Sequence, residues 1–89
     1  MRDMLAKAAA EGYGVGNFDV FNTELIKGVM EAAKECSAPV ILAYGPPFEK
    51  YSPLKHFGKA MRSWADDTDL PVVIHYDHGT SLEGCKHAV

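Results

Sequence analysis

The stretch "LPVVIHYDHGTSLEG", residues 70–84, joins an apolar run to a polar end and then to a helix start. Val72, Val73 and Ile74 are β-branched, which favours a buried strand. His75 lies within this run, and Asp77 and His78 follow it. Carboxylate and imidazole groups can move protons, and imidazole binds metals. The stretch therefore predicts a strand whose carboxyl end carries chemistry.

A second stretch, "APVILAYG" at 38–45, repeats this pattern earlier in the chain. Pro39 and Pro71, like Tyr44 and Tyr76, are separated by 32 residues. A third stretch rich in aromatic and β-branched residues, at 15–20, predicts another strand. The repeating unit is one strand followed by one helix.

Helical patterns lie between the predicted strands. Asn22 and Ser52 are suited to accept hydrogen bonds from the free amides that begin a helix, with Pro53 as a first helical residue. Thr80 and Glu83 have the spacing of a capping box, and Thr80 and Ser81 are both expected to cap the last helix. The predicted helices cover residues 3–11, 23–36, 53–65 and 81–89.

Alternating strands and helices predict an α/β fold with a parallel sheet made of βα units. Three parallel strands do not close a barrel, and the last predicted helix stops without a cap at Val89. We therefore expect residues 1–89 to be an incomplete domain, the N-terminal portion of a (β/α)₈ (TIM) barrel with about three βα units. A complete small α/β domain is the alternative, and it would leave the third strand as an unpaired edge.

Composition limits the possible partners. The net charge is −3, and the nine Lys and Arg residues are scattered along the chain, so no basic surface for nucleic acid is expected. There is neither a signal-peptide pattern nor an apolar run of the ~20 residues that a membrane helix needs, so we expect a cytoplasmic protein with no membrane partner. Cys36 and Cys85 lack metal-type spacing and are expected to be buried thiols.

Barrel enzymes carry their active sites at the carboxyl ends of the strands. Asp77, His78 and Gly79 would lie there, together with residues 19–22 and 45–47. His75 shares the strand face of Asp77 and could orient it. A histidine satisfied in the core is an equal alternative for His75.

The segments "GVGNFDVFNTELIKGVMEAAKECSAPVIL" and "PVVIHYDHGTSLEGCKHAV" resemble the N-terminal third of class II, zinc-dependent ketose-bisphosphate aldolases. The resemblance implies that His78 is the first protein ligand of a catalytic zinc and that Asp77 is the acid/base of carbon–carbon cleavage. It further implies a sugar-phosphate substrate, a homo-oligomer (dimer or tetramer) and a role in carbohydrate metabolism. The other zinc ligands, the phosphate loop and a monovalent-cation site would come from later strands.

Two positions at the strand ends depart from this family. Asp19 stands where the family has a substrate-contacting asparagine, and an acid there would repel a phosphorylated substrate. Ala43-Tyr44-Gly45 replaces a Gln-x-Ser segment whose serine lies near a substrate phosphate. Asp19 and Gly45 are thus expected substrate-binding positions with changed chemistry.

The sequence leaves three functions open. The first is a metal-dependent aldolase acting on a phosphorylated ketose, to which the 89 residues alone would contribute a defective site. The second is a degenerate aldolase-like segment with a structural or assembly role. The third is a barrel enzyme that uses the same metal position for another carbonyl substrate.

Overall fold

The computed structural model describes residues 1–89 and has alternating helices and strands. The order of its elements is α1 (Arg2–Glu11), β1 (Gly16–Asp19), α2 (Thr23–Cys36), β2 (Val40–Tyr44), the 3₁₀ helix η1 (Pro46–Phe48), α3 (Leu54–Asp66), β3 (Val72–Tyr76) and α4 (Leu82–Ala88). The predicted strands and α-helices are all present, and η1 is the one helical element that the sequence pattern did not indicate.

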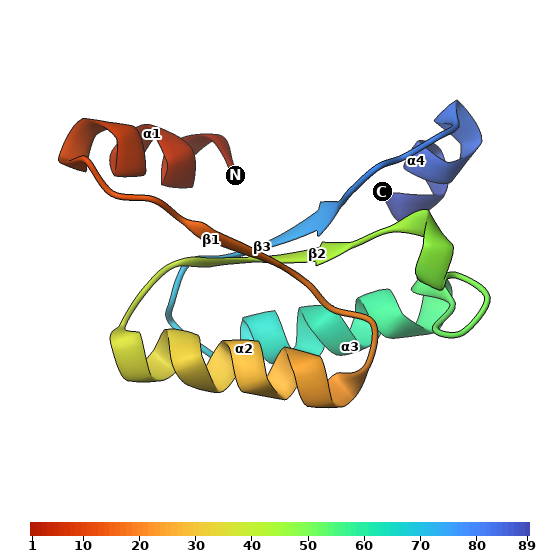
Figure 1. The fold of residues 1–89 in the computed structure, drawn as a ribbon, viewed down its shortest axis with the longest axis horizontal. Coiled ribbons are helices and arrows are strands. Elements are labelled where there is room, and N and C mark those ends of the chain that lie inside the picture. The colour runs from red at the N-terminus through yellow and green to blue at the C-terminus, as the bar shows by residue number, and fades with distance from the viewer.

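The three strands form one parallel sheet in the order β1-β2-β3 (Figure 1). Val40 in β2 is the partner of Gly16 in β1 and of Val72 in β3. The predicted βα units are therefore confirmed, and the α/β fold is that of the N-terminal portion of a barrel. β1 and β3 each have one outer edge that no strand of this chain pairs.

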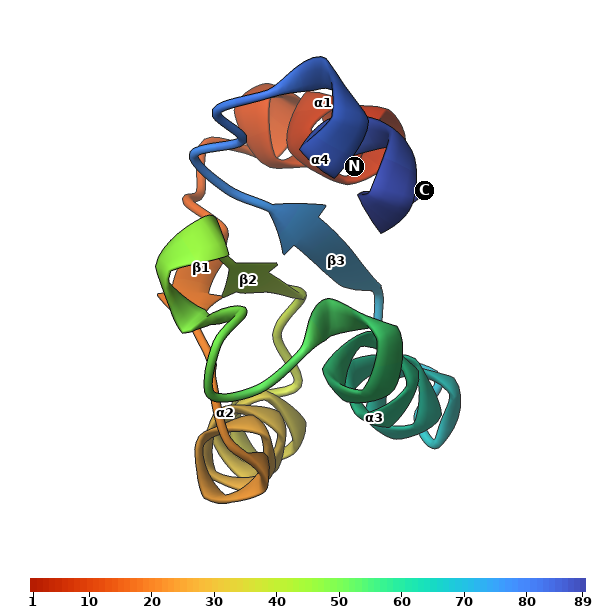
Figure 2. The same ribbon diagram turned by 90° about the vertical axis from the view of Figure 1, so that its right-hand side faces the viewer.

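Helices α2 and α3 cover one face of the sheet, and both views show α1 and α4 on the other side (Figures 1 and 2). Alternate side chains of the strands join the two covering helices in one apolar cluster, whose burial is the main source of stability. Its buried members are Val20, Ile26, Met30, Ala33, Val40, Leu42, Tyr44, Phe57 and Met61. We call the sheet face opposite α2 and α3 the inner face. No helix is long and apolar enough to cross a membrane.

The predicted helix caps are confirmed at α2, wrong at α3 and confirmed in part at α4. Asn22 caps α2 as predicted, because its side-chain oxygen accepts a hydrogen bond from the Leu25 amide at 2.8 Å. The predicted cap of α3 by Ser52 is wrong, since that hydroxyl instead donates to the carbonyl of Phe21 at 2.6 Å. At α4 the predicted cap by Thr80 is wrong, whereas the cap by Ser81 is confirmed, because the Ser81 side chain accepts a hydrogen bond from the Gly84 amide.

Tyr44 connects the end of β2 to the loop that follows it. Its buried hydroxyl donates to the Ser52 carbonyl at 2.7 Å and lies 3.0 Å from Oε2 of Glu49. The same Glu49 oxygen accepts from the Leu54 amide at 3.1 Å and so supplies the cap that α3 otherwise lacks. Burial, with the hydrogen bond to Glu49, raises the pKa of Tyr44 above its ordinary value.

Replacing Tyr44 with phenylalanine should lower the free energy of unfolding by about 1 kcal/mol, because it leaves the Ser52 and Glu49 acceptors without their donor. The raised pKa adds a pH dependence. Above pH ~10 the unfolded chain loses the tyrosine proton while the folded chain keeps it, so stability is fully present below that pH and falls as pH rises through the folded pKa. Urea unfolding at pH 8 and pH 11 measures both effects. A difference between wild type and Tyr44→Phe that does not shrink at pH 11 would contradict this assignment.

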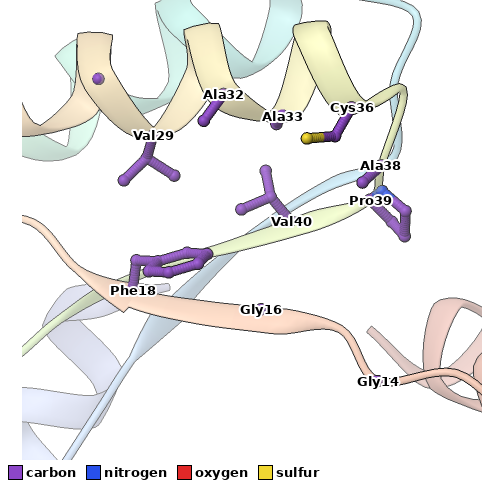
Figure 3. Close-up of a pocket in the computed structure, with 11 residues that line it drawn as sticks. Gly14, Gly16, Phe18, Val29, Ala32, Ala33, Cys36, Ala38, Pro39 and Val40 are labelled. Atoms are coloured by element: carbon purple, nitrogen blue, oxygen red, sulfur yellow. The ribbon is translucent and has the colours of Figure 1, made fainter.

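An apolar groove of about 360 Å³ lies between α2 and the strands β1 and β2 (Figure 3). Val29 and Ala32 of α2 project toward Phe18 and Val40 of the sheet. Cys36 also lines the groove and is exposed, as is Cys85, so the prediction of two buried thiols is wrong. The reason is that the part of the sheet beside the last turn of α2 is left partly open.

Candidate active site

The carboxyl ends of the three strands meet at one edge of the sheet. In the register of the sheet, Asp19 of β1 is the partner of Ala43, and Ala43 is the partner of His75. The ladder continues one residue further, because the Asp77 amide donates to the Tyr44 carbonyl at 2.9 Å. Asp19 and His75 therefore lie in one row across the sheet, and Asp77 lies in a neighbouring row.

The two faces of the sheet carry different chemistry at this edge. Val20, Tyr44 and Tyr76 pack with α2 and α3 in the apolar cluster. Since successive side chains of a strand alternate between faces, Asp19 and Asp77 lie on the inner face. The carboxylates at the carboxyl ends of the strands are thus gathered opposite the covering helices.

The carboxylate of Asp77 lies between two imidazoles. Nε2 of His75 is 3.5 Å from Oδ1 of Asp77, and Nε2 of His78 is 3.5 Å from Oδ2. The Asp77 side chain is 30% exposed and that of His78 is 85% exposed. The Asp77 carboxylate, which can accept a proton, is therefore oriented by one imidazole on each side and remains accessible to a substrate.

The backbone turns sharply at His78. Its φ is 54°, in the left-handed region that costs a non-glycine residue about 1–2 kcal/mol. The amide of His78 donates to Oδ1 of Asp77 at 2.9 Å, which helps to hold this turn. The turn ends the strand and leaves the imidazole at the rim of the sheet, where it can reach a ligand.

These residues fit part of a metal site. With Nε2 of His78 facing Asp77, its other ring nitrogen is available to a metal, and a carboxylate beside a ligating histidine is the common supporting arrangement. No group of three His, Cys, Asp or Glu side chains in the 89 residues could hold a metal ion on its own. A catalytic zinc has three protein ligands as a rule, so residues 1–89 could hold only part of such a site.

The two expected substrate positions lie apart from this cluster. Asp19 is exposed and makes no ion pair or side-chain hydrogen bond. In the sheet, Ala43 lies between Asp19 and His75 and pairs with both. Gly45 is buried and packs against the backbone of Asp77, because a Cβ built on Gly45 would lie 3.5 Å from the Asp77 carbonyl oxygen. His56 lies in α3 and His87 in α4, and neither makes an ion pair with the Asp77 cluster.

Sequence reasoning missed the way in which the loops after β1 and β2 are joined. Besides the hydrogen bond from Ser52 to Phe21, the rings of Phe21 and Phe48 stack with centroids 4.7 Å apart. The prolines at 46 and 47 are typical of a turn-rich loop, but no local signal shows which segment it contacts. The loops after β1 and β2 therefore pack against each other beside the carboxyl ends of these strands.

Comparisons with known proteins agree with this geometry. The family profile described as fructose-bisphosphate aldolase class-II matches residues 1–89. The chain belongs to the class-II fructose-bisphosphate aldolase family.

Members of this aldolase family resemble the chain in sequence and in structure. The fructose-bisphosphate aldolase of Thermus caldophilus is 40% identical over 98% of this chain and 28% of its own length. That of Staphylococcus aureus (strain Mu50 / ATCC 700699) is 37% identical over 100% of this chain and 32% of its own. The crystal structure of the YdjI aldolase from Escherichia coli K12 is 34% identical with a TM-score of 0.95, covering 99% of this chain and 34% of that one. The chain thus spans about a third of the length of the aldolases that it matches.

Proposed function

We propose that residues 1–89 form the first part of the catalytic barrel of a metal-dependent aldolase that cleaves and re-forms a carbon–carbon bond in a phosphorylated ketose. The observation that carries this proposal is the Asp77 carboxylate held between His75 and His78 at the carboxyl end of β3. Family membership supports aldolase chemistry in general.

Asp77 is the proposed acid/base. In the cleavage direction its carboxylate accepts the proton of the substrate hydroxyl beside the bond that breaks. As that carbon becomes an aldehyde, the electron pair of the broken bond passes to the other fragment, which leaves as an enediolate. In the condensation direction Asp77 returns the proton. The contact with His75 holds the carboxylate in the orientation that both directions need.

His78 is the proposed protein ligand of zinc in this part of the barrel. When bound, a divalent cation supplies Lewis acidity that stabilises the negative charge developing on the enediolate. The remaining ligands, and a monovalent-cation site, are expected outside residues 1–89. A homo-oligomeric assembly and a cytoplasmic location also stay predictions.

Aldol cleavage by the complete protein tests this proposal. We expect the purified protein to release an aldehyde from a ketose 1-phosphate, to lose that activity with a strong chelator, and to recover it with added zinc. Activity that survives complete removal of divalent metal would contradict the metal-dependent mechanism. Substrate profiling in the same assay would reveal a different carbonyl substrate.

A structural role is the second candidate function, and it is favoured by the departures from the family pattern at Asp19, Ala43 and Gly45. The intact mass of the purified protein separates the two candidates. A mass near the ~30 kDa of a whole barrel supports the enzyme. A mass of 9.7 kDa, that of these residues alone, supports the structural role.

A further inference from the structure

We infer that the part of the active site above β1 and β2 binds an uncharged, hydroxyl-bearing portion of the ketose and excludes a phosphate, so that the substrate carries phosphate at one end only. This inference rests on the proposed aldolase function. We call this part of the site the β1–β2 rim and define it as Asp19, Ala43 and the loop 45–53.

The β1–β2 rim carries two exposed acids, Asp19 and Glu49, and a single cation, Lys50. Asp19 is an exposed acid with no ion-pair partner. Ala43, its neighbour in the row, is 1% exposed and presents only a methyl group. Lys50 is the one cation of the loop, and its ammonium lies 4.7 Å from the centre of the Tyr51 ring. The rim therefore presents more negative than positive charge to an entering phosphate.

The backbone of the loop is equally poor in free donors. Proline has no amide hydrogen, and the loop has three prolines, at 46, 47 and 53. The amides of Phe48 and Glu49 donate to the carbonyls of Gly45 and Pro46. Those of Tyr51 and Ser52 both donate to the carbonyl of Phe48. Phosphate sites depend on several convergent N–H groups, and four of the six backbone amides in this loop are already used.

The loop is also held against rearrangement. The hydroxyl of Ser52 is already donated to Phe21, and the Ser52 carbonyl is bound by the buried Tyr44 hydroxyl. Glu49, a second acid, is held there by the same tyrosine. A rearrangement that freed the Ser52 hydroxyl to bind phosphate would break these contacts. The shortage of hydrogen-bond donors in the rim is therefore stabilised by the fold.

Asp19 is suited to a different group. A carboxylate accepts hydrogen bonds and has none to give, which matches the hydroxyls of a sugar chain. Neighbouring strands lie ~4.8 Å apart, which puts Asp19 ~10 Å across the sheet from its row partner His75 and farther from Asp77, two residues along. That separation corresponds to substrate carbons several bonds beyond the one that Asp77 acts on. Asp19 is therefore assigned as a residue that determines specificity.

The experiment compares cleavage of fructose 1-phosphate and fructose 1,6-bisphosphate by the complete protein and by the Asp19→Asn variant. We expect wild type to prefer the monophosphate. Asp19→Asn keeps the size of the side chain and removes its charge, so it should raise the bisphosphate-to-monophosphate ratio of kcat/KM about tenfold, mainly through KM. Asp69→Asn, at an exposed acid near the opposite end of β3, should leave the ratio unchanged, and so should Lys50→Met.

Two outcomes would overturn the inference while the aldolase function stands: a wild type that prefers the bisphosphate, or an unchanged ratio in Asp19→Asn. A loss of bisphosphate cleavage in Lys50→Met would also overturn it, because Lys50 would then be a phosphate ligand. Failure of the wild type to cleave either ketose, with zinc supplied, would instead overturn the proposed function and this inference with it.

Discussion

Replacing Asp77 with asparagine in the complete protein is expected to lower kcat by a factor of about 10²–10⁴, the usual contribution of a positioned acid/base. Asparagine keeps the size of the side chain and an oxygen that can accept from the His78 amide, but it cannot take up the substrate proton. Zinc should remain bound, because His78 is intact. Steady-state kinetics and metal analysis of the same sample measure both effects.

The matched control for this substitution is Asp69→Asn, which makes the same chemical change at an exposed turn. It should leave kcat unchanged. An Asp77→Asn enzyme that turns over at the wild-type rate would show that another group moves the proton.

Replacing His78 with alanine is expected to remove zinc. Loss of a residue that only supports a ligand costs metal affinity 10–100-fold as a rule, so loss of a ligand itself should cost more than about 100-fold. The variant should be purified with little zinc and should regain only part of its activity at high zinc concentration. Zinc titration of the metal-free protein gives the affinity directly.

The matched control for His78→Ala is His56→Ala, a change at another exposed histidine, in α3. Zinc content and activity should both be unaffected there. Unchanged zinc affinity in His78→Ala would remove the assignment of His78 as a ligand, whatever its effect on rate.

The sheet could be predicted from the sequence because buried parallel strands leave a strong local signal. "VILAY" and "VVIHY" are nearly continuous apolar runs, and β2 and β3 occupy these same five residues each. Asn22 could likewise be assigned as a cap, since the cap and the amide that it accepts from are three residues apart.

The predicted start of α3 was wrong because it depends on contacts that no local pattern contains. Ser52 is committed to Phe21, 31 residues away in sequence, and Glu49 takes over the start of α3 because Tyr44 holds it in place. The exposure of Cys36 and Cys85 has a similar cause, since burial at a helix face depends on which elements cover it.

The site shows the same division between local and distant information. The order of His75, Asp77 and His78 at a strand end predicts that they lie together, and the structure places each imidazole 3.5 Å from the carboxylate. The left-handed backbone of His78 could not be predicted, because the usual signal for that conformation is glycine or asparagine. The shortage of free backbone amides in the loop 45–53 could not be predicted either, because it depends on which carbonyls these amides bind in the folded loop.

The most direct test of the account is to locate the metal in the complete protein by anomalous diffraction at the zinc absorption edge. We expect a peak ~2.0–2.1 Å from a ring nitrogen of His78, with the carboxylate of Asp77 beside it and two further protein ligands from outside residues 1–89. A protein with full aldolase activity whose zinc lies elsewhere, with His78 unliganded, would contradict the account.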